Sequence, residues 1–326
     1  MITSRTEPTL VTGPGYATPR AYPAGVPDLR RDELTGRWVI VAPARSARPH
    51  TFPPPPDAKD APADCPFCHG NESLTPPEVH RTGPGDAETP GWRVRVVPNL
   101  YPITPGHEVV VLSPDHARSF AQLDDAGAGE VLAVMRDRVR FHLEHGARYV
   151  QPLVNHGREA GASLEHPHGQ IVPLDVVPPA VQHQLDRYAH AGTDPVDSEA
   201  EAAGPTGLDV LTGTAALWCP HAAATPFELR IAHRGRACRF DEATDDEIAA
   251  VATTTREGLR RLAAVVGDVP YNLVVHSAPP GTAFHWWIEV QTRVAVVAGF
   301  EMGTGIFVNV TPPDLAAQQL REAARS

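Results

Sequence analysis

The sequence predicts an α+β fold of two related units, each an antiparallel sheet with a helix packed against it, joined into one broad, half-barrel-like sheet. One observation is an order of strand and helix patterns that occurs twice along the chain. A second is a histidine at the start of a strand near the end of each repeat. A third is size: 326 residues, 42% of them apolar, suffice for a large core in one large domain or two coupled ones.

In the first repeat, apolar residues at helical spacing predict a helix that begins beside Asp124 and Asp125, both suitable as N-caps. The helix is expected at 123–146, and strands are expected at 38–42, 92–97, 107–112, 149–154 and 169–174. The second repeat has strand patterns at 226–232, 271–276 and 285–291 and a helix pattern at 244–266. When the two repeats are matched element by element, His166 and His168 correspond to His285 and Trp287, so the second copy has lost one histidine.

The predicted boundaries follow composition. Residues 1–27, rich in Pro, Gly and Thr, are expected to form a flexible N-terminal arm, and the Pro-rich stretch 49–62 to be extended. Residues 28–190 form the first unit, residues 191–207 a solvated linker, and residues 208–326 the second unit.

Charge and cysteine content exclude several classes of protein. A net charge of -11 argues against a nucleic-acid binder, which needs a basic face. No apolar stretch is long enough to span a bilayer and no signal peptide is apparent, so a cytoplasmic protein without membrane contact is expected. Of the four cysteines, Cys65 and Cys68 have a spacing that suggests a metal site, with a reduced metal-free pair as the alternative. Cys219 and Cys238 are expected to be small buried apolar residues.

The segment from Asn155 to Gln170 carries the chemistry. Because residues two apart in a strand share a face, His166, His168 and Gln170 can point to the same side. A neutral imidazole can attack phosphorus, and Gln170, Ser163 and Asn155 could then hold a phosphate oxygen as charge develops. The alternative is that the two histidines are ordinary surface residues or a plain metal pair.

The motif His166-Pro167-His168-Gly169-Gln170 resembles the active-site motif of the galactose-1-phosphate uridylyltransferases, a branch of the histidine triad superfamily. The resemblance extends over about residues 28–325, through matching segments at 30–40, 65–68, 97–102, 113–116 and 298–305. It implies duplicated histidine-triad-like units.

The resemblance also implies roles for individual residues. His168 would be the nucleophile that carries the nucleoside monophosphate, and a structural zinc would be held by Cys65, Cys68, His116 and His166. Arg45 and Arg48 would contact substrate phosphate, within one chain or across a dimer interface, unless they are exposed charges that follow a strand. Phe67 and Asn99 would line the base pocket and Glu301 would contact the hexose, each with a structural role as the alternative.

One departure from the family concerns a second metal site, which in several members uses a His-x-His motif in the second half. Here that motif is His285-Trp286-Trp287, and tryptophan cannot ligate a metal. We therefore expect no second metal, and structural roles for His276 and His285.

The resemblance favours a ping-pong transferase of galactose metabolism, expected to be a homodimer. It would transfer UMP from UDP-glucose through nucleotidyl-His168 to galactose 1-phosphate. Residues 299–309 also resemble a sister group that acts on ADP-glucose with phosphate, so the alternative is a related enzyme using ADP-glucose or another nucleotide sugar, with phosphate or a different sugar 1-phosphate. A zinc-stabilised nucleotide-binding module and a hydrolase of the histidine triad type are further alternatives.

Overall fold

A computed structural model of the chain describes residues 27–47 and 64–324, and it contains one large and one small sheet. The large sheet has ten strands in the order β3-β4-β5-β7-β6-β11-β12-β10-β9-β8, and every neighbouring pair is antiparallel. Its strands are β3 (His80–Arg81), β4 (Arg95–Pro98), β5 (Glu108–Val111), β6 (Tyr149–His156), β7 (His168–Leu174), β8 (Asp209–Leu211), β9 (Ala215–Trp218), β10 (Leu229–His233), β11 (Tyr271–His276) and β12 (Trp287–Thr292). This confirms the predicted α+β class and the single broad sheet.

The strand order supports the predicted duplication. From one edge inward the order is β3-β4-β5-β7-β6, and from the other edge inward it is β8-β9-β10-β12-β11. The two halves therefore have the same topology and meet where β6 pairs with β11. In each half a long helix follows the third strand along the chain. The helix α1 (Asp125–Glu144) connects β5 to β6, and α4 (Asp245–Val266) connects β10 to β11.

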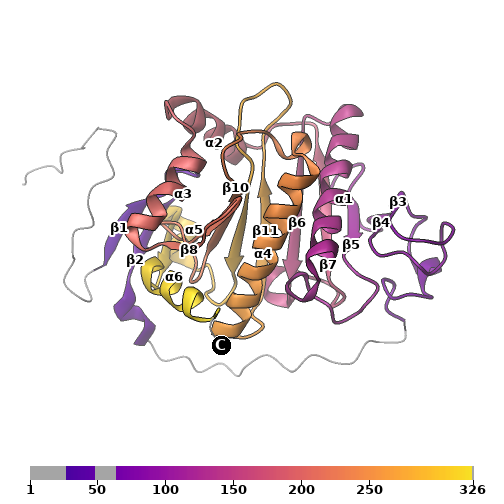
Figure 1. Cartoon of the computed structure of the whole chain (residues 1–326), viewed down its shortest axis with the longest axis horizontal. Coiled ribbons are helices and arrows are strands. Elements are labelled where there is room, and N and C mark those ends of the chain that lie inside the picture. Colours follow the sequence, from indigo (N-terminus) through magenta and orange to yellow (C-terminus); the bar gives the residue numbers. More distant parts are fainter. Residues whose placement is uncertain (1–26, 48–63, 325–326) are drawn as a thin grey trace, which may run out of the picture.

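The two long helices pack side by side on one face of the large sheet (Figure 1). Asp124 caps α1 by accepting a hydrogen bond from the Gly127 amide at 2.7 Å, and Thr244 caps α4 in a capping box with Glu247. Their apolar faces and the sheet enclose the main hydrophobic core, which includes Val131, Met135, Val251, Leu259 and Ile288. Since this face is filled, a functional site has to lie on the other face. No helix in the described ranges combines the length and apolarity that a membrane span requires.

A small sheet lies beside the β8–β10 end of the large sheet (Figure 1). It consists of β1 (Asp28–Arg31), β2 (Trp38–Val41) and β13 (Ile306–Asn309), with β13 parallel to β2. The short helix η1 (Pro43–Ala47) follows β2, and α5 (Gly299–Thr304) directly precedes β13. The C-terminal helix α6 (Pro313–Glu322) packs against β8 and α4. The remaining short helices are η2 (Glu72–Leu74), η3 (Phe120–Gln122), η4 (Arg158–Ala160) and η5 (Phe240–Glu242).

The prediction of a solvated linker at 191–207 is wrong for most of that segment. After α2 (Pro179–His190), residues Pro195–Thr206 form the helix α3, capped by Asp194 and ended by Gly207 in the left-handed region. Composition misled the prediction because the polar residues of α3 conceal one apolar stripe. That stripe, Val196, Ala200 and Ala203, is buried in a second hydrophobic cluster on the sheet face opposite α4. The predicted arm at 1–27 and the Pro-rich stretch 49–62 lie almost wholly outside the described residues.

Candidate active site

The strand β7 presents His168 and Gln170 on the sheet face opposite α1. In the ladder with β5, His168 pairs with Val111 and Gln170 with Val109, so both side chains lie beside the buried apolar cluster that includes these valines. Between them, Gly169 faces α1, and a Cβ there would lie 3.1 Å from the Leu153 carbonyl oxygen and 3.4 Å from Met135 Cε. This glycine lets the helix pack closely behind the strand that carries both polar residues.

His168 is held in one orientation, with one ring nitrogen free. Its Nδ1 lies 2.8 Å from the His166 carbonyl oxygen, which can only accept, so Nδ1 carries the proton and Nε2 keeps its lone pair. Burial lowers the pKa of His168 and favours this neutral form. The Phe67 ring lies 5.4 Å from the imidazole, centroid to centroid. The geometry is that of an oriented nucleophile beside an apolar wall.

Asn155 lies next to His168, whereas Ser163 lies in a loop. Asn155 follows Val154, whose partner in β7 is Gly169, so its side chain lies next to His168 on the same face. Its Oδ1 accepts a hydrogen bond of 2.7 Å from Asn272 Nδ2, which leaves its amide nitrogen for another partner. Ser163 is exposed in the loop between η4 and β7.

The four cysteine and histidine side chains predicted to bind zinc come together. Cys65 Sγ lies 3.7 Å and Cys68 Sγ 3.6 Å from His166 Nδ1, and Cys68 Sγ lies 3.5 Å from His116 Nδ1. His166 Nε2 lies 2.8 Å from the Ser113 carbonyl oxygen and must donate to it, so in the neutral ring the Nδ1 lone pair faces the thiols. Tetrahedral zinc with ordinary bond lengths requires sulfur-to-nitrogen separations of about 3.6 Å. The cluster therefore has the donors and spacing to hold a metal ion.

The predicted substrate residues divide into two groups. Phe67 is buried beside His168, and Asn99, which follows β4, is half-buried with its Nδ2 3.3 Å from His107 Nε2. Arg45 is exposed on η1, and the Glu301 carboxylate accepts a 3.0 Å hydrogen bond from the Ala298 amide at the start of α5. Both of these helices adjoin strands of the small sheet, at the other end of the large sheet from β4 and β5 (Figure 1). Arg48 lies outside the described residues.

Two hydrogen-bonding partners of site residues were not predicted as functional. His107 is buried immediately before β5, and Asn272, on β11, is the donor to Asn155. The only sequence signal for His107 is a polar residue at the inward-facing end of an apolar strand. Asn272 could not have been found from the sequence, because its contact with Asn155 depends on the pairing of β11 with β6 across the two halves.

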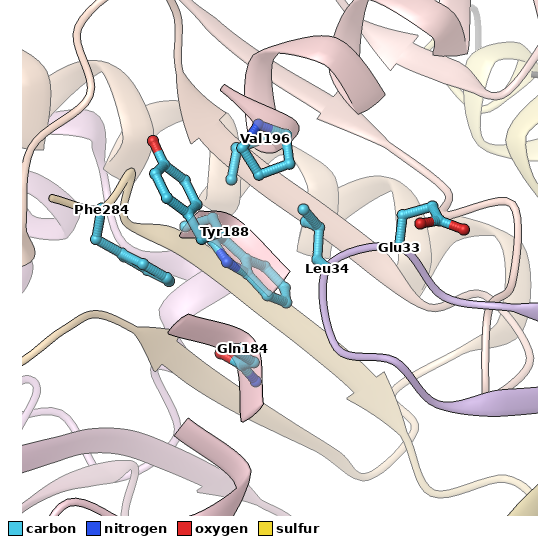
Figure 2. A pocket seen from close by; sticks show the side chains of 8 residues that line it. Glu33, Leu34, Gln184, Tyr188, Val196 and Phe284 are labelled. Atoms are coloured by element: carbon cyan, nitrogen blue, oxygen red, sulfur yellow. The ribbon is translucent and has the colours of Figure 1, made fainter. Parts of the chain in front are cut away.

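The second half has a different arrangement at the equivalent position. Ile288 pairs with Val275 as Gly169 pairs with Val154, so Trp287 takes the place of His168 and His276 that of Asn155. The His276 and Trp287 rings stack with centroids 3.8 Å apart. The cavity that remains beside Trp287 has a volume of about 10 Å³. Its walls come from α2, α3 and the loop after β1, as Figure 2 shows. At most one water molecule fits there, so the space beside Trp287 is filled by protein side chains.

His285, the counterpart of His166, is held without a thiol ligand. Its Nε2 lies 2.8 Å from the His233 carbonyl oxygen, and its Nδ1 lies 2.7 Å from the carboxylate of Asp194. Each ring nitrogen of His285 therefore has an oxygen within hydrogen-bond distance, and one of these oxygens belongs to the N-cap of α3. Asp194, Asp197 and His285 could also hold a cation, but the two hydrogen bonds account for the His285 ring. The absence of a second metal remains a prediction.

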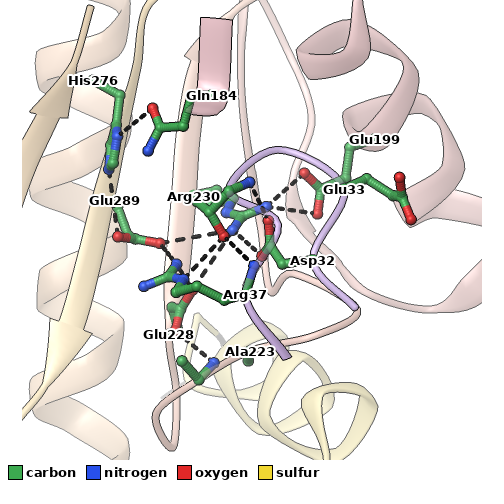
Figure 3. Close-up of polar contacts among 12 residues, drawn as sticks. Asp32, Glu33, Arg37, Gln184, Glu199, Ala223, Glu228, Arg230, His276 and Glu289 are labelled. Atoms are coloured by element: carbon green, nitrogen blue, oxygen red, sulfur yellow. Dashed lines mark hydrogen bonds and ion pairs between the residues drawn. The ribbon is translucent and has the colours of Figure 1, made fainter. Parts of the chain in front are cut away.

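A charge cluster around Arg230 joins the loop between β1 and β2 to strands of the second half (Figure 3). Arg230, fully buried on β10, contacts Asp32 and lies 2.7 Å from Glu199, with its guanidinium 4.8 Å from the Trp287 ring centroid. Arg37 contacts Glu289 and lies 3.3 Å from Glu228. Burial, reinforced by the Glu289 carboxylate, raises the pKa of Glu228 to about 8. Two guanidiniums thus pair with four carboxyl groups, of which Glu199 is half-buried and the other three are buried. These side chains occupy the face that would otherwise be a second site.

Comparisons with known proteins agree with this geometry. A family described as a domain of unknown function (DUF4921) matches residues 130–325. An ADP-glucose phosphorylase from Arabidopsis thaliana is 30% identical over 359 residues, covering 96% of this chain and 99% of that protein. A galactose-1-phosphate uridylyltransferase from Thermotoga maritima is 26% identical over 323 residues, covering 90% of this chain and 98% of that protein.

Solved structures show the same relationship. A crystal structure of the ADP-glucose phosphorylase from Arabidopsis thaliana with bound ADP-glucose has a TM-score of 0.81 at 30% identity, covering 91% of this chain and 98% of that one. A uridylyltransferase structure has a TM-score of 0.69 at 26% identity, covering 91% and 98%. The fold and these relatives define a nucleotidyltransferase. The chain belongs to the galactose-1-phosphate uridylyltransferase family of the histidine triad superfamily.

Proposed function

We propose that this enzyme transfers a nucleoside monophosphate from a nucleotide sugar in two steps through a covalent intermediate on His168. The observation that carries the proposal is the oriented ring of His168, with Nδ1 bound to the His166 carbonyl and Nε2 free. In the first step the Nε2 lone pair attacks the α-phosphorus, and the bond from that phosphorus to the bridging oxygen breaks. The sugar 1-phosphate leaves with the electron pair. In the second step an acceptor phosphate oxygen attacks, the phosphorus–nitrogen bond breaks, and neutral His168 is regenerated.

Neighbouring side chains would stabilise the transferred phosphoryl group and hold the base. Gln170 and Asn155 lie on the face of His168 and can donate amide hydrogens to the non-bridging oxygens, and Ser163 can add a hydroxyl from the loop. Phe67 offers an apolar ring beside His168, and Asn99 follows β4, which is separated from β7 by β5. Both would serve as base-pocket residues. We propose zinc as the metal held by the Cys65 cluster. Bound there, it would fix the position of His166 and so of the carbonyl that orients His168.

We propose ADP-glucose as the first candidate donor, with inorganic phosphate as acceptor. The higher structural similarity to the ADP-glucose phosphorylase, a TM-score of 0.81 against 0.69, supports this choice. UDP-glucose with galactose 1-phosphate is the second candidate. It is supported by the His166–Gln170 motif, which resembles that of the uridylyltransferases, and by relatives of that name.

The experiment is to incubate the protein with each donor in turn, without acceptor, and to look for a covalent adduct by intact mass. We expect an adduct with ADP-glucose or UDP-glucose whose mass identifies the nucleotide, and none in His168→Ala, which lacks the attacking nitrogen. Adding phosphate or galactose 1-phosphate to the isolated adduct then identifies the acceptor. His145→Ala, which removes an exposed histidine at the end of α1, is the matched control and should react like the parent.

Three outcomes would count against the proposal. An adduct that persists in His168→Ala would place the nucleophile elsewhere. Nucleotide binding without any adduct would favour the binding module, and an adduct discharged only by water would favour the hydrolase.

We further propose that Arg45 acts on the site of a second copy of the chain, because η1 follows β2 of the small sheet, at the other end of the large sheet from β4 and β5 (Figure 1). Arg45→Ala alone and His168→Ala alone should both transfer poorly. When the two variants are co-expressed with different tags and the mixed dimer is isolated, one of its two sites has both residues, so about half of the parent rate should return. A mixed dimer as inactive as its parents would mean that Arg45 serves its own chain or none.

A further inference from the structure

We propose that His107 is a positioning residue that fixes the side-chain amide of Gln170 with its nitrogen available for the substrate phosphate. This inference rests on the proposed nucleotidyl transfer and adds to it a residue that does not itself touch the reacting atoms. His107 immediately precedes β5, and Gln170 lies opposite Val109 in the adjacent strand β7.

The tautomer of His107 follows from its two neighbours. The Ile103 amide, which can only donate, lies 3.3 Å from His107 Nδ1, so Nδ1 accepts. Burial lowers the pKa of His107 and favours the neutral ring, whose single proton is then on Nε2. His107 Nε2 lies 2.9 Å from Gln170 Oε1 and donates to it.

The contact with Asn99 does not compete with this bond. Asn99 Oδ1 accepts a 2.8 Å hydrogen bond from the Tyr101 amide, so its nitrogen is the atom 3.3 Å from His107 Nε2. Two nitrogens that both carry protons cannot hydrogen-bond to one another, so the proton on Nε2 remains directed to Gln170. Because His107 is only 3% exposed, water has little access to take its place as the donor to Gln170 Oε1.

Fixing Oε1 of Gln170 matters because a glutamine amide can rotate by half a turn at little cost. With Oε1 held by His107, the NH₂ group is free to donate to a phosphate oxygen as charge develops there. In the opposite orientation the oxygen would face the phosphate and repel it. The hydrogen bond from His107 therefore prevents this rotated orientation of the Gln170 amide, which the strand by itself would allow.

The test is a double-mutant cycle read by the single-turnover rate of adduct formation. His107→Leu should slow nucleotidylation of His168 about tenfold, with donor affinity changed much less. Gln170→Ala should slow it about a hundredfold. In the Gln170→Ala background, His107→Leu should cause no further loss, because its effect acts through Gln170. His107→Gln, which places an amide donor near the position of Nε2, should recover part of the rate.

The possible results separate this inference from the proposed function. No adduct in the parent with any donor overturns both. If His107→Leu leaves the rate of adduct formation unchanged, only the role of His107 is overturned. The same holds if His107→Leu lowers that rate equally in the parent and in Gln170→Ala. If a His107 variant fails to fold, the tautomer of His107 can still be measured directly in the parent protein. Nitrogen NMR of histidine-labelled parent should show His107 protonated on Nε2, and protonation on Nδ1 would overturn the inference.

Discussion

Replacing Arg230 with methionine should lower the free energy of unfolding by about 3–5 kcal/mol, because it leaves buried carboxylates without their partner. Arg230 is fully buried and contacts Asp32 and Glu199, from the loop after β1 and from α3. The methionine fills much of the volume, so the loss reports the charge more than a cavity. Chemical denaturation of the two proteins measures it. Arg93→Met, which breaks the exposed pair with Glu130, is the control and should leave the midpoint unchanged.

The pH dependence of this difference provides a second check. The raised pKa of Glu228 means that the folded protein holds a proton which the unfolded chain releases above its ordinary value of 4.5. The stability contributed by this group is complete below pH 4.5 and is lost as pH rises to about 8. Without Arg230 a further carboxyl group must be protonated on folding, so the deficit of the variant should grow over the same range. A deficit independent of pH would indicate that packing, not charge, is what Arg230 supplies.

The sequence predicted the parts of the fold that depend on local periodicity. The helices expected at 123–146 and 244–266 are α1 and α4, because one apolar stripe in each meets one broad sheet. The expected strand at 226–232 begins later, at Leu229, since Phe227 adopts a left-handed turn conformation with φ of 55°. The helix α3 was missed because its apolar stripe is made mostly of alanines, whose burial depends on tertiary contacts with β8 and β9.

The candidate site shows the same division between local and long-range information. The alternation of side chains along a strand was enough to place His168 and Gln170 on one face. The short spacing of Cys65 and Cys68 in the sequence was enough to predict that they lie together. The contact between His107 and Gln170 could not be predicted, because it joins residues 63 positions apart through the register of β5 and β7. The separation of Arg45 from His168 likewise depends on where the small sheet docks.

Removing one ligand of the predicted zinc site should abolish metal binding and lower the free energy of unfolding by more than about 4 kcal/mol, since structural zinc contributes folding free energy directly. Cys65→Ser is the sharpest change, because Cys65 is buried and its thiol lies 3.7 Å from His166 Nδ1. Emission spectrometry should find about one zinc per chain in the parent and almost none in the variant. Cys238→Ser, at a buried cysteine outside the cluster, should retain the metal.

Asp194→Asn distinguishes the two halves in the same assay. The change removes the negative charge beside His285 and keeps an oxygen acceptor, and it should leave the zinc content at one per chain, because hydrogen bonds and not a metal hold the His285 ring. Two metals in the parent, with one lost in Asp194→Asn, would show instead that the second half holds a cation.

The zinc site also bears on catalysis, because His166 belongs to both. Its ring is a predicted ligand, and its carbonyl oxygen accepts the hydrogen bond that orients His168. Metal-depleted parent protein should therefore form the His168 adduct more slowly at temperatures where it remains folded, and adding zinc should restore the rate. An unchanged rate in depleted but folded protein would mean that the strand β7 alone fixes His168, and that the metal stabilises the fold without positioning the nucleophile.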